Sequence, residues 1–289
     1  MESMKMRGAP KIPVAKQSST ASAKKSSVDK KLTEEENKTI SELKKLYLET
    51  IKLDVDLQQE IYNMEKSFEA KHKAIFEKRY NILEDFRKKS HGDSSSESNI
   101  SNFWLRVLKA SYTEFISKKD EKILTYLTDI RSKLCNEPTV KFIIEFHFEP
   151  NEFFSNRILT KTYFLNCLPN VDDPLSYDGA EIYKCEGCKI DWKQNYNEQD
   201  KKAYTSFFDF FNPPKLPDDT EDPNYCDINA ILQNDFELGF YLKERVIPKA
   251  VMFFTGEIAD CQSSDSESEE TDDDDDDDDV SSTNDVNDE

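Results

Sequence analysis

The sequence predicts an α+β fold, in which a long helix precedes an antiparallel β-sheet dome layered with helices, and a disordered acidic C-terminal tail follows. Three observations support this prediction. The stretch from Thr33 to Ser90 has neither Gly nor Pro, and Val140 to Glu149 alternates apolar and polar residues. Almost nothing beyond Asp260 is apolar. The predicted regions are a disordered basic arm (1–32), the long helix (33–90), a Ser-rich linker (91–101), the α+β dome (102–258) and the disordered acidic tail (259–289).

Charge is unevenly distributed along the 289 residues. The net charge is -20, residues 1–31 carry eight Lys or Arg against two acids, and residues 260–289 carry sixteen acids and no base. The two ends therefore hold +6 and -16, and because the total is -20, the segment between them holds -10. The folded part is thus predicted to be acidic. The apolar fraction of the whole chain, 36%, lies below the value of about 45 to 50% in compact domains, which predicts that part of the chain is unfolded.

The long helix has a start signal and an apolar seam. Thr33 with Glu36 three residues later is a capping-box signature, and His91-Gly92 ends the helix. At 1.5 Å per residue the helix would span about 85 Å, roughly twice the width of the remaining folded chain, so most of the seam cannot be covered in cis. The seam follows three-then-four spacing, and its expected dimer-interface residues are Leu57, Ile61, Met64, Phe68, Ile75 and Ile82.

An alternative is a solvent-exposed or kinked helix that folds back on its own domain. A monomer would then expose a stripe of large apolar residues, which favours dimerisation. In the N-terminal third Thr50 and Asp54 interrupt the seam, so a hinge or a separate short helix is the alternative there.

The residues after the linker predict helices packed on a sheet. Apolar residues three and four apart mark one short helix at 103–108 and another from Ile123 through Ile130 to Leu134. In Val140 to Glu149 every second residue is apolar, which is typical of a strand with one solvent-exposed face. Segments 158–168 and 182–192 predict further antiparallel strands, because their connections are too short for crossover helices.

Helical spacing returns near the end of the predicted dome. It runs from Ile228 to Leu242, and Ile247-Pro248 predicts the start of a new short helix that passes through Phe254 and ends at Gly256. Residues beyond Asp260 cannot bury enough apolar surface to offset their ordering entropy, which predicts disorder.

Several of these segments, in this order, resemble the nucleosome assembly protein and SET family. They are the helix with IYNMEKSFEAKHKAIFEKRYNIL, then NFWLRVLKA, EKILTYLTDI, FIIEFHFEPNEFFSNRILTKTYFL, KIDWK, SFFDFF and DFELGFYLKERVIPKAVMFFTGEI. The resemblance covers about Leu43 to Gly256. It implies a homodimer held by antiparallel pairing of the long helices. It also implies that core histones bind on the acidic concave side.

The resemblance further implies a histone chaperone that mediates nucleosome assembly, disassembly and histone transport, shuttling between nucleus and cytoplasm. Many members carry a Lys/Arg-rich import signal after the Ile-x-Trp-Lys motif, but here that stretch offers only Lys201 and Lys202. No cofactor, membrane or sequence-specific nucleic acid is implied. The rival interpretation is a coiled-coil acidic adaptor or a phosphatase-inhibitor-like regulator, in which the acid serves solubility.

Acidic residues are the candidates for binding a cationic partner. An extended aspartate run carries one charge per about 3.4 Å, whereas duplex DNA carries one per about 1.7 Å. An acidic tail alone would therefore bind a cationic partner less strongly than DNA does. Fixed contacts on the dome are therefore expected. The alternative for each acidic residue is that it only keeps the protein surface solvated. The candidates are Asp218, Asp219, Glu221, Asp222, Asp227, Asp235 and Glu237 on the dome, with Asp272, Asp273, Asp274, Asp275, Asp276, Asp277, Asp278 and Asp279 in the tail.

Other candidate sites have weaker signals. Cys185 and Cys188 have metal-ligand spacing, but a second such pair is missing and His147 falls among solvent-facing strand positions, so we expect free thiols and no zinc. Six cysteines in a Lys- and Glu-rich chain with no apolar leader favour reduced thiols inside the cell. No glycine-rich phosphate loop or nucleophile elbow is present, so we expect no enzyme. The phosphorylation candidates, each with an acid three residues later, are Ser264, Ser266 and Thr271.

Overall fold

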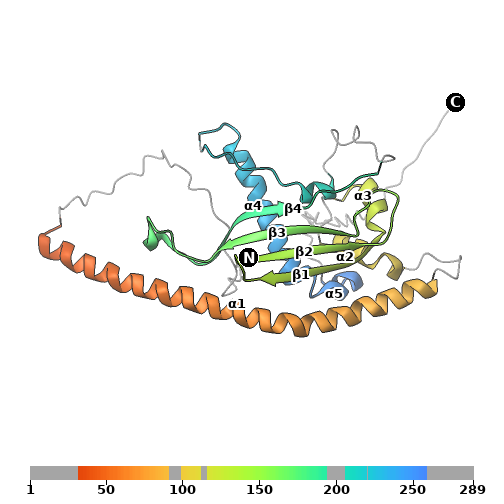
Figure 1. The fold of residues 1–289 in the computed structure, drawn as a ribbon, viewed down its shortest axis with the longest axis horizontal. Coiled ribbons are helices and arrows are strands. Elements are labelled where there is room, and N and C mark those ends of the chain that lie inside the picture. The colour runs from red at the N-terminus through yellow and green to blue at the C-terminus, as the bar shows by residue number, and fades with distance from the viewer. Residues whose placement is uncertain (1–31, 91–98, 112–115, 194–205, 220, 259–289) are drawn as a thin grey trace, which may run out of the picture.

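The structure, a computed structural model, describes residues 32–90, 99–111, 116–193, 206–219 and 221–258. A long helix lies along one side of a dome built from a four-stranded sheet and shorter helices (Figure 1). This architecture confirms the predicted fold class. The elements are α1 (Glu34–Ser90), α2 (Phe103–Ser111), α3 (Lys118–Leu124), β1 (Leu127–Cys135), β2 (Lys141–Phe148), β3 (Ile158–Asn166), β4 (Glu181–Gly187), the 3-10 turn η5 (Phe207–Phe211), α4 (Tyr225–Tyr241), the π-helical turn η6 (Leu242–Val246) and α5 (Ala250–Thr255).

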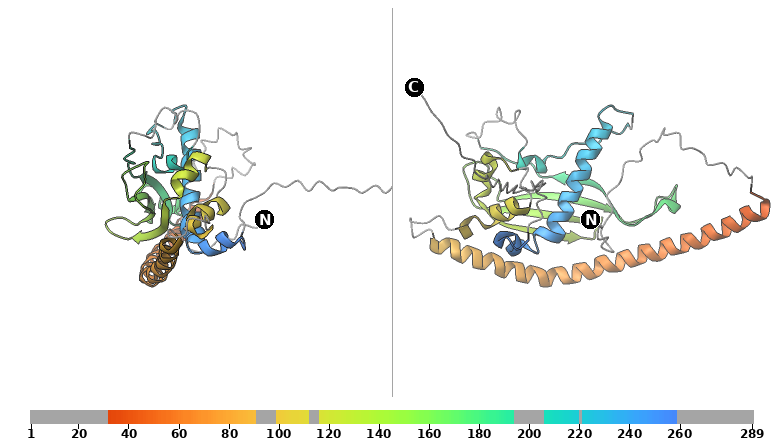
Figure 2. Two further views of the ribbon diagram at one scale, coloured as in Figure 1. Left: turned by 90° about the vertical axis from the view of Figure 1, so that its right-hand side faces the viewer. Right: turned by 180° about the vertical axis from the view of Figure 1, so that it is seen from behind.

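Helix α1 is a single, gently curved element of 57 residues (Figures 1 and 2). Its predicted capping box is present: the Thr33 amide donates to Glu36 Oε2 at 2.7 Å, and the Glu36 amide donates to Thr33 Oγ1 at 3.2 Å. Three acids in the first turn and three bases in the last turn complement the helix dipole. The helix is continuous through Thr50 and Asp54, so neither a hinge nor a separate short helix is found there.

The four strands form an antiparallel sheet in the order β1-β2-β3-β4. Strand β2 alternates strictly between half-buried and buried residues, as its sequence pattern predicts. The buried side, here called the inner face, packs against helices α2 and α4, and α5 packs on α2 (Figure 2, right). The opposite side is here called the outer face, and in Figure 1 it is turned toward the viewer.

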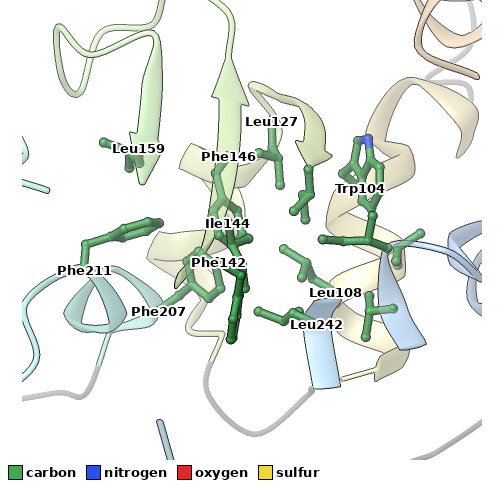
Figure 3. Close-up of a cluster of buried hydrophobic side chains, with 14 of the residues drawn as sticks. Trp104, Leu108, Leu127, Phe142, Ile144, Phe146, Leu159, Phe207, Phe211 and Leu242 are labelled. Atoms are coloured by element: carbon green, nitrogen blue, oxygen red, sulfur yellow. The ribbon is translucent and has the colours of Figure 1, made fainter. Parts of the chain in front are cut away.

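An aromatic and aliphatic core fills the space between the inner face and the helices (Figure 3). Phe146 contacts the rings of Phe207 and Phe211 edge-on, with centroids 5.8 and 5.3 Å apart. Trp104 and Leu108 of α2 lie on the other side of this core and are fully buried. The segment SFFDFF thus provides a wall of the core, held by a capping box in which Ser206 and Asp209 bond to each other's backbone amides.

The prediction of a helix from Ile123 to Leu134 is wrong beyond Leu124. Helix α3 ends at Leu124, and residues 127–135 form the edge strand β1. A bulge between Leu127 and Asp129 explains the misleading pattern, because it inserts an extra residue and brings Leu127 and Ile130, three apart, to the same face. Ile130 and Leu134, four apart, share a face in a strand as well as in a helix.

The C-terminal helices follow the prediction, with one addition. Helix α4 and the short helix α5 are present, and Gly256 ends α5 in the left-handed conformation with a φ of 78°. The π-helical turn η6 between them is not evident from the sequence. Gly239 of α4 lies against the ring of Tyr163, where a Cβ atom would come within 2.2 Å of the ring. Glycine thus allows α4 to approach β3 closely.

Candidate functional site

One side of α1 carries large apolar residues that no described part of the chain covers. Leu46, Leu53, Leu57, Met64, Phe68, Ile75 and Ile82 are between 46% and 71% exposed. They recur at four or seven residues and therefore form one continuous stripe, here called the α1 stripe. It contains five of the six predicted dimer-interface residues. The sixth, Ile61, is half-buried.

A second stripe of α1 packs on the dome about a third of a turn away. Ile51 and Tyr62 are 2% and 3% exposed, against the β3–β4 connection that holds Cys167 and Tyr177. Burial, together with the nearby Cys167 thiol, raises the pKa of the Tyr62 hydroxyl. Because the dome already occupies this second stripe, the exposed α1 stripe is not a by-product of a detached helix.

Two arginines, one half-buried and one buried, fix the C-terminal half of α1 to the dome. Arg79 donates to the Ile247 carbonyl at 2.6 Å and lies 3.6 Å from the carboxylate of Asp129, which is fully buried. Its guanidinium also lies over the Trp104 ring, 4.8 Å from the centroid. Arg87 pairs with Glu149 at 2.7 Å. The helix and dome therefore behave as one body, so that a partner bound to the α1 stripe is placed at a fixed angle to the dome.

A groove of about 920 Å³ runs beside the α1 stripe, between α1 and the dome. Met64 and Phe68 of the stripe line it together with Leu134 of β1 and Pro248. The apolar surface is thus continuous from the stripe into the groove at the middle of the helix.

The predicted acidic residues of the dome gather around the N-terminal end of α4. Asp218, Asp219, Glu221 and Asp227 are exposed, and Asp222 is half-buried. Two of their carboxylates also order the local chain, because Asp219 accepts from the Glu221 amide at 2.9 Å and Asp222 accepts from the Asn224 amide at 2.8 Å. Figures 1 and 2 place this end of α4 on the far side of the sheet from α1. The acidic surface and the α1 stripe therefore do not overlap.

Asp235 differs from the other acidic candidates because its carboxylate is nearly buried and does not belong to the exposed acidic surface. Its carboxylate is 11% exposed and lies 2.5 Å from the ammonium of Lys161, whose side chain is fully buried. The Tyr163 hydroxyl donates to the same carboxylate at 2.8 Å, and Lys161 also donates to the Phe210 carbonyl at 2.6 Å. Asp235 is thus committed to docking α4 on β3. Glu237, two residues further, is exposed.

The Lys161–Asp235 pair is the main feature that the sequence analysis missed. A signal exists, because alternation along β3 puts Lys161 on the same face as Leu159 and Tyr163, and a buried lysine requires an anionic partner. Nothing in the sequence identifies that partner as Asp235, 74 residues away.

Comparison with known proteins decides the family. A family model described as "Nucleosome assembly protein (NAP)" matches residues 38–203 and 197–257. The chain belongs to the nucleosome assembly protein family. The relative named nucleosome assembly protein 1-like 1 from Rattus norvegicus is 32% identical over 279 residues, covering 78% of this chain and 70% of that protein. Its counterpart from Homo sapiens is 32% identical over 280 residues, covering 78% and 71%.

Solved structures of nucleosome assembly proteins share the fold. The crystal structure of the nucleosome assembly protein of a malaria parasite matches with a TM-score of 0.54 at 28% identity, covering 79% of this chain and 100% of that chain. That of Plasmodium falciparum matches with a TM-score of 0.53 at 28% identity, covering 78% and 100%. The resemblance inferred from the sequence motifs is thereby confirmed.

The residues that the sequence offers as possible metal ligands in this nucleosome assembly protein are Cys185, Cys188 and His147. Within the described ranges no three His, Cys, Asp or Glu side chains are grouped to hold a metal ion. Cys188 Sγ accepts from the Thr160 amide at 3.2 Å, and burial raises the pKa of the Cys185 thiol to about 12. His147 lies on the outer face and bonds to Glu145 at 3.2 Å. Both thiols are free.

Several predicted sites lie outside the described residues. They are the acids at 272–279, the phosphorylation candidates Ser264, Ser266 and Thr271, and the lysines at 201 and 202. Residues 1–31 of the predicted basic arm (1–32), residues 91–98 of the predicted linker (91–101) and the whole predicted tail (259–289) are outside them too. Among the helices that are described, none is long and apolar enough to cross a membrane.

Proposed function

We propose that this chain is a histone chaperone that binds core histones through its acidic surface and mediates their assembly into and removal from nucleosomes, without covalent chemistry. The observation that carries the proposal is its place in the nucleosome assembly protein family, combined with an exposed acidic cluster held on a rigid dome. We include histone transport between cytoplasm and nucleus in the proposal.

The charges of the dome support this role. Histones are strongly cationic, and an acidic field speeds the capture of a cationic partner by about ten- to a thousand-fold at low salt. The carboxylates at 218–227 are fixed by the docking of α4, so they add geometric selectivity to this attraction. The tail would then mainly raise the encounter rate, and the dome would supply orientation.

Truncation after Glu257 is expected to leave histone binding intact at physiological salt, because the fixed dome contacts remain. Changing Asp218, Asp219 and Asp227 to Asn and Glu221 to Gln in the truncated chain is expected to weaken binding by about tenfold or more. Fluorescence titration with each histone pair, repeated over a salt series, measures both effects.

Four acids of α1 serve as the control for this acidic cluster. Replacing Glu42, Glu49, Asp56 and Asp85, all exposed, with their amides changes the net charge equally. Histone affinity should then be nearly unchanged. The proposed role of the dome would be contradicted if truncation alone abolished histone binding. It would also be contradicted if both sets of substitutions weakened binding equally, because the acidic residues would then act only through total charge. The rival adaptor interpretation requires that the full-length chain fail to bind histones at physiological salt.

We further propose that the chaperone is a homodimer whose α1 helices pair antiparallel along the α1 stripe. The stripe supports this arrangement because four of its residues are symmetric about Met64: Leu46 corresponds to Ile82, and Leu53 to Ile75. A two-fold axis near Met64 would bring these apolar pairs together, as a self-complementary interface requires.

This register predicts a specific cross-link. In a variant with Met64→Cys, a short thiol-reactive cross-linker is expected to join two chains in high yield, because the two substituted residues would meet at the axis. Leu46→Cys should give no more product than the parent chain, since its expected neighbour in the partner copy is Ile82. Denaturing gel electrophoresis measures the yield. Efficient cross-linking through Leu46→Cys would indicate parallel pairing and contradict the proposed register.

A further inference from the structure

The connection between β3 and β4, residues 167–180, has no role in the proposed function. Figure 1 shows that it extends past the sheet, and its 3-10 turn at 174–176 contacts α1. The base of the connection is fixed, because the Tyr177 hydroxyl donates to the Cys167 carbonyl at 3.3 Å and both residues lie near the Tyr62 hydroxyl of α1. Its tip is open to solvent, with Val171 94% exposed. The return of this accessible segment to the sheet begins directly after Tyr177.

This return contains Asp178-Gly179, the one Asp-Gly pair in the 289 residues, and the sequence has no Asn-Gly pair. Asp178 is exposed. Gly179 has a φ of 104°, a conformation that favours glycine, and no atom lies within 4 Å of the place where a Cβ would stand. In the part of the chain that the structure describes, the Gly179 amide donates no hydrogen bond. The amide nitrogen is therefore neither shielded by a side chain nor held by an acceptor.

Such a pair can undergo a reaction that needs only the chain and water. The amide nitrogen of the glycine attacks the side-chain carboxyl carbon of the aspartate, and the carboxyl hydroxyl leaves with the amide proton as water. Because both groups belong to adjacent residues, the attack is intramolecular and forms a five-membered succinimide ring. One water molecule then opens the ring at either carbonyl. The product is aspartate again or isoaspartate, in which the backbone runs through the side-chain carbonyl and the α-carboxylate is free.

Isoaspartate would lengthen the backbone by one methylene group between two fixed points. On one side Tyr177 bonds to Cys167, and on the other Ala180 is 2% exposed and Glu181 pairs with Asn166 at the start of β4. The added atom changes the span of the chain between these points. Since β4 is held by its ladder and by the core, the single contact of Tyr177 is expected to break first. The thiol of Cys167 would then become more accessible.

We propose that Asp178 converts spontaneously to isoaspartate in the folded protein, and that the conversion loosens the β3–β4 connection from α1. The free α-carboxylate in this exposed segment would be a substrate for a carboxyl methyltransferase. That enzyme transfers a methyl group from S-adenosylmethionine to a carboxylate oxygen and leaves S-adenosylhomocysteine. The methyl ester closes again to the succinimide with loss of methanol, so that repeated cycles return the residue to aspartate.

Incubation of the full-length chain at physiological temperature and neutral pH tests the first part of the proposal. The tryptic peptide 162–184 contains Asp172, Asp173 and Asp178, so the three aspartates are compared in one molecule. Mass spectrometry with electron-transfer fragmentation distinguishes isoaspartate from aspartate at each position. Isoaspartate is expected to accumulate at Asp178 about tenfold faster than at Asp172, which corresponds to a barrier lower by about 1.4 kcal/mol. It should not form at Asp173, because Pro174 has no amide hydrogen.

Two variants and an unfolded reference make this measurement decisive. Asp178→Glu keeps the charge but would need a six-membered ring, so the signal should be lost. Asp178→Asn should react faster, because ammonia leaves more readily than water. The chain unfolded in urea gives the rate that the sequence alone allows. A folded rate more than about tenfold below the unfolded one would overturn the proposal, since the connection would then hold the amide away from the carboxyl. Equal rates at Asp172 and Asp178 would overturn it as well.

Thiol alkylation with iodoacetamide tests the second part. Burial raises the pKa of the Cys167 thiol, which keeps its reactivity low. Cys167 and Asp178 lie in the same tryptic peptide, so converted and unconverted chains are compared in one sample. Cys167 is expected to be alkylated several-fold faster in the converted chains. Cys135, also half-buried but on β1, is the control and should react equally fast in fresh and incubated protein. An unchanged rate at Cys167 would show that the connection absorbs the extra atom, which contradicts the proposed loosening.

Discussion

Changing Phe68 and Ile75 to Glu together is expected to convert the dimer into a folded monomer. Both side chains belong to the α1 stripe, 46% and 60% exposed, and neither packs on the dome. Burying such a side chain contributes about 1.5–3 kcal/mol, and a two-fold interface contains each residue twice. Four lost contacts remove about 6–12 kcal/mol, which raises the dissociation constant by at least about 10⁴-fold. Sedimentation equilibrium should report one 33.6-kDa chain where the parent gives two.

A matched variant separates this effect from the added charge. Ala74→Glu with Asn81→Glu places the same two charges on α1 with the same seven-residue spacing, at exposed positions outside both stripes. It should remain dimeric. Far-UV circular dichroism should show the Phe68 and Ile75 variant folded, since the contacts between α1 and the dome are retained. A parent chain that is already monomeric at micromolar concentration would rule out the pairing of α1 helices.

Prediction of the fold succeeded where a local pattern has one structural interpretation. A stretch of 57 residues without Gly or Pro is compatible mainly with a helix, and strict alternation in β2 is compatible with a strand that buries one face. It failed at β1, where the spacing of Leu127, Ile130 and Leu134 fits a helix unless a bulge intervenes. Bulges depend on pairing with a second strand, and that information is not local.

The candidate site divides in the same way. The α1 stripe follows from periodicity and from the length of the helix, which exceeds what the dome can cover. The acidic set could be named from composition, but composition could not distinguish Asp235, which lies inside, from Asp227 and Glu237, which lie outside. Only the approach of α4 to β3, made possible by Gly239, determines which carboxylate is buried.

Asp235→Ala is expected to be the most destabilising single substitution in the dome. It leaves the fully buried ammonium of Lys161 without its carboxylate and removes the nearer of the two acceptors of the Tyr163 hydroxyl, the other being the Asp235 backbone carbonyl at 3.1 Å. Breaking a buried ion pair by removing one partner costs about 3–5 kcal/mol, because the remaining charge stays desolvated. For a chain of this size the melting temperature should fall by about 6–20 °C, measured by calorimetry or circular dichroism. Histone affinity should fall too, since the acidic end of α4 would lose its fixed position.

Two comparisons identify burial as the cause. Glu186→Ala breaks an ion pair with Lys184 of the same 2.5 Å length, but both side chains are about half exposed, so water replaces the lost partner and the melting temperature should not change. Lys161→Met combined with Asp235→Leu removes both charges and should recover much of the stability lost in Asp235→Ala. If the double variant were as unstable as Asp235→Ala, the hydrogen bonds of Tyr163 and of the Phe210 carbonyl, rather than the stranded charge, would account for the loss.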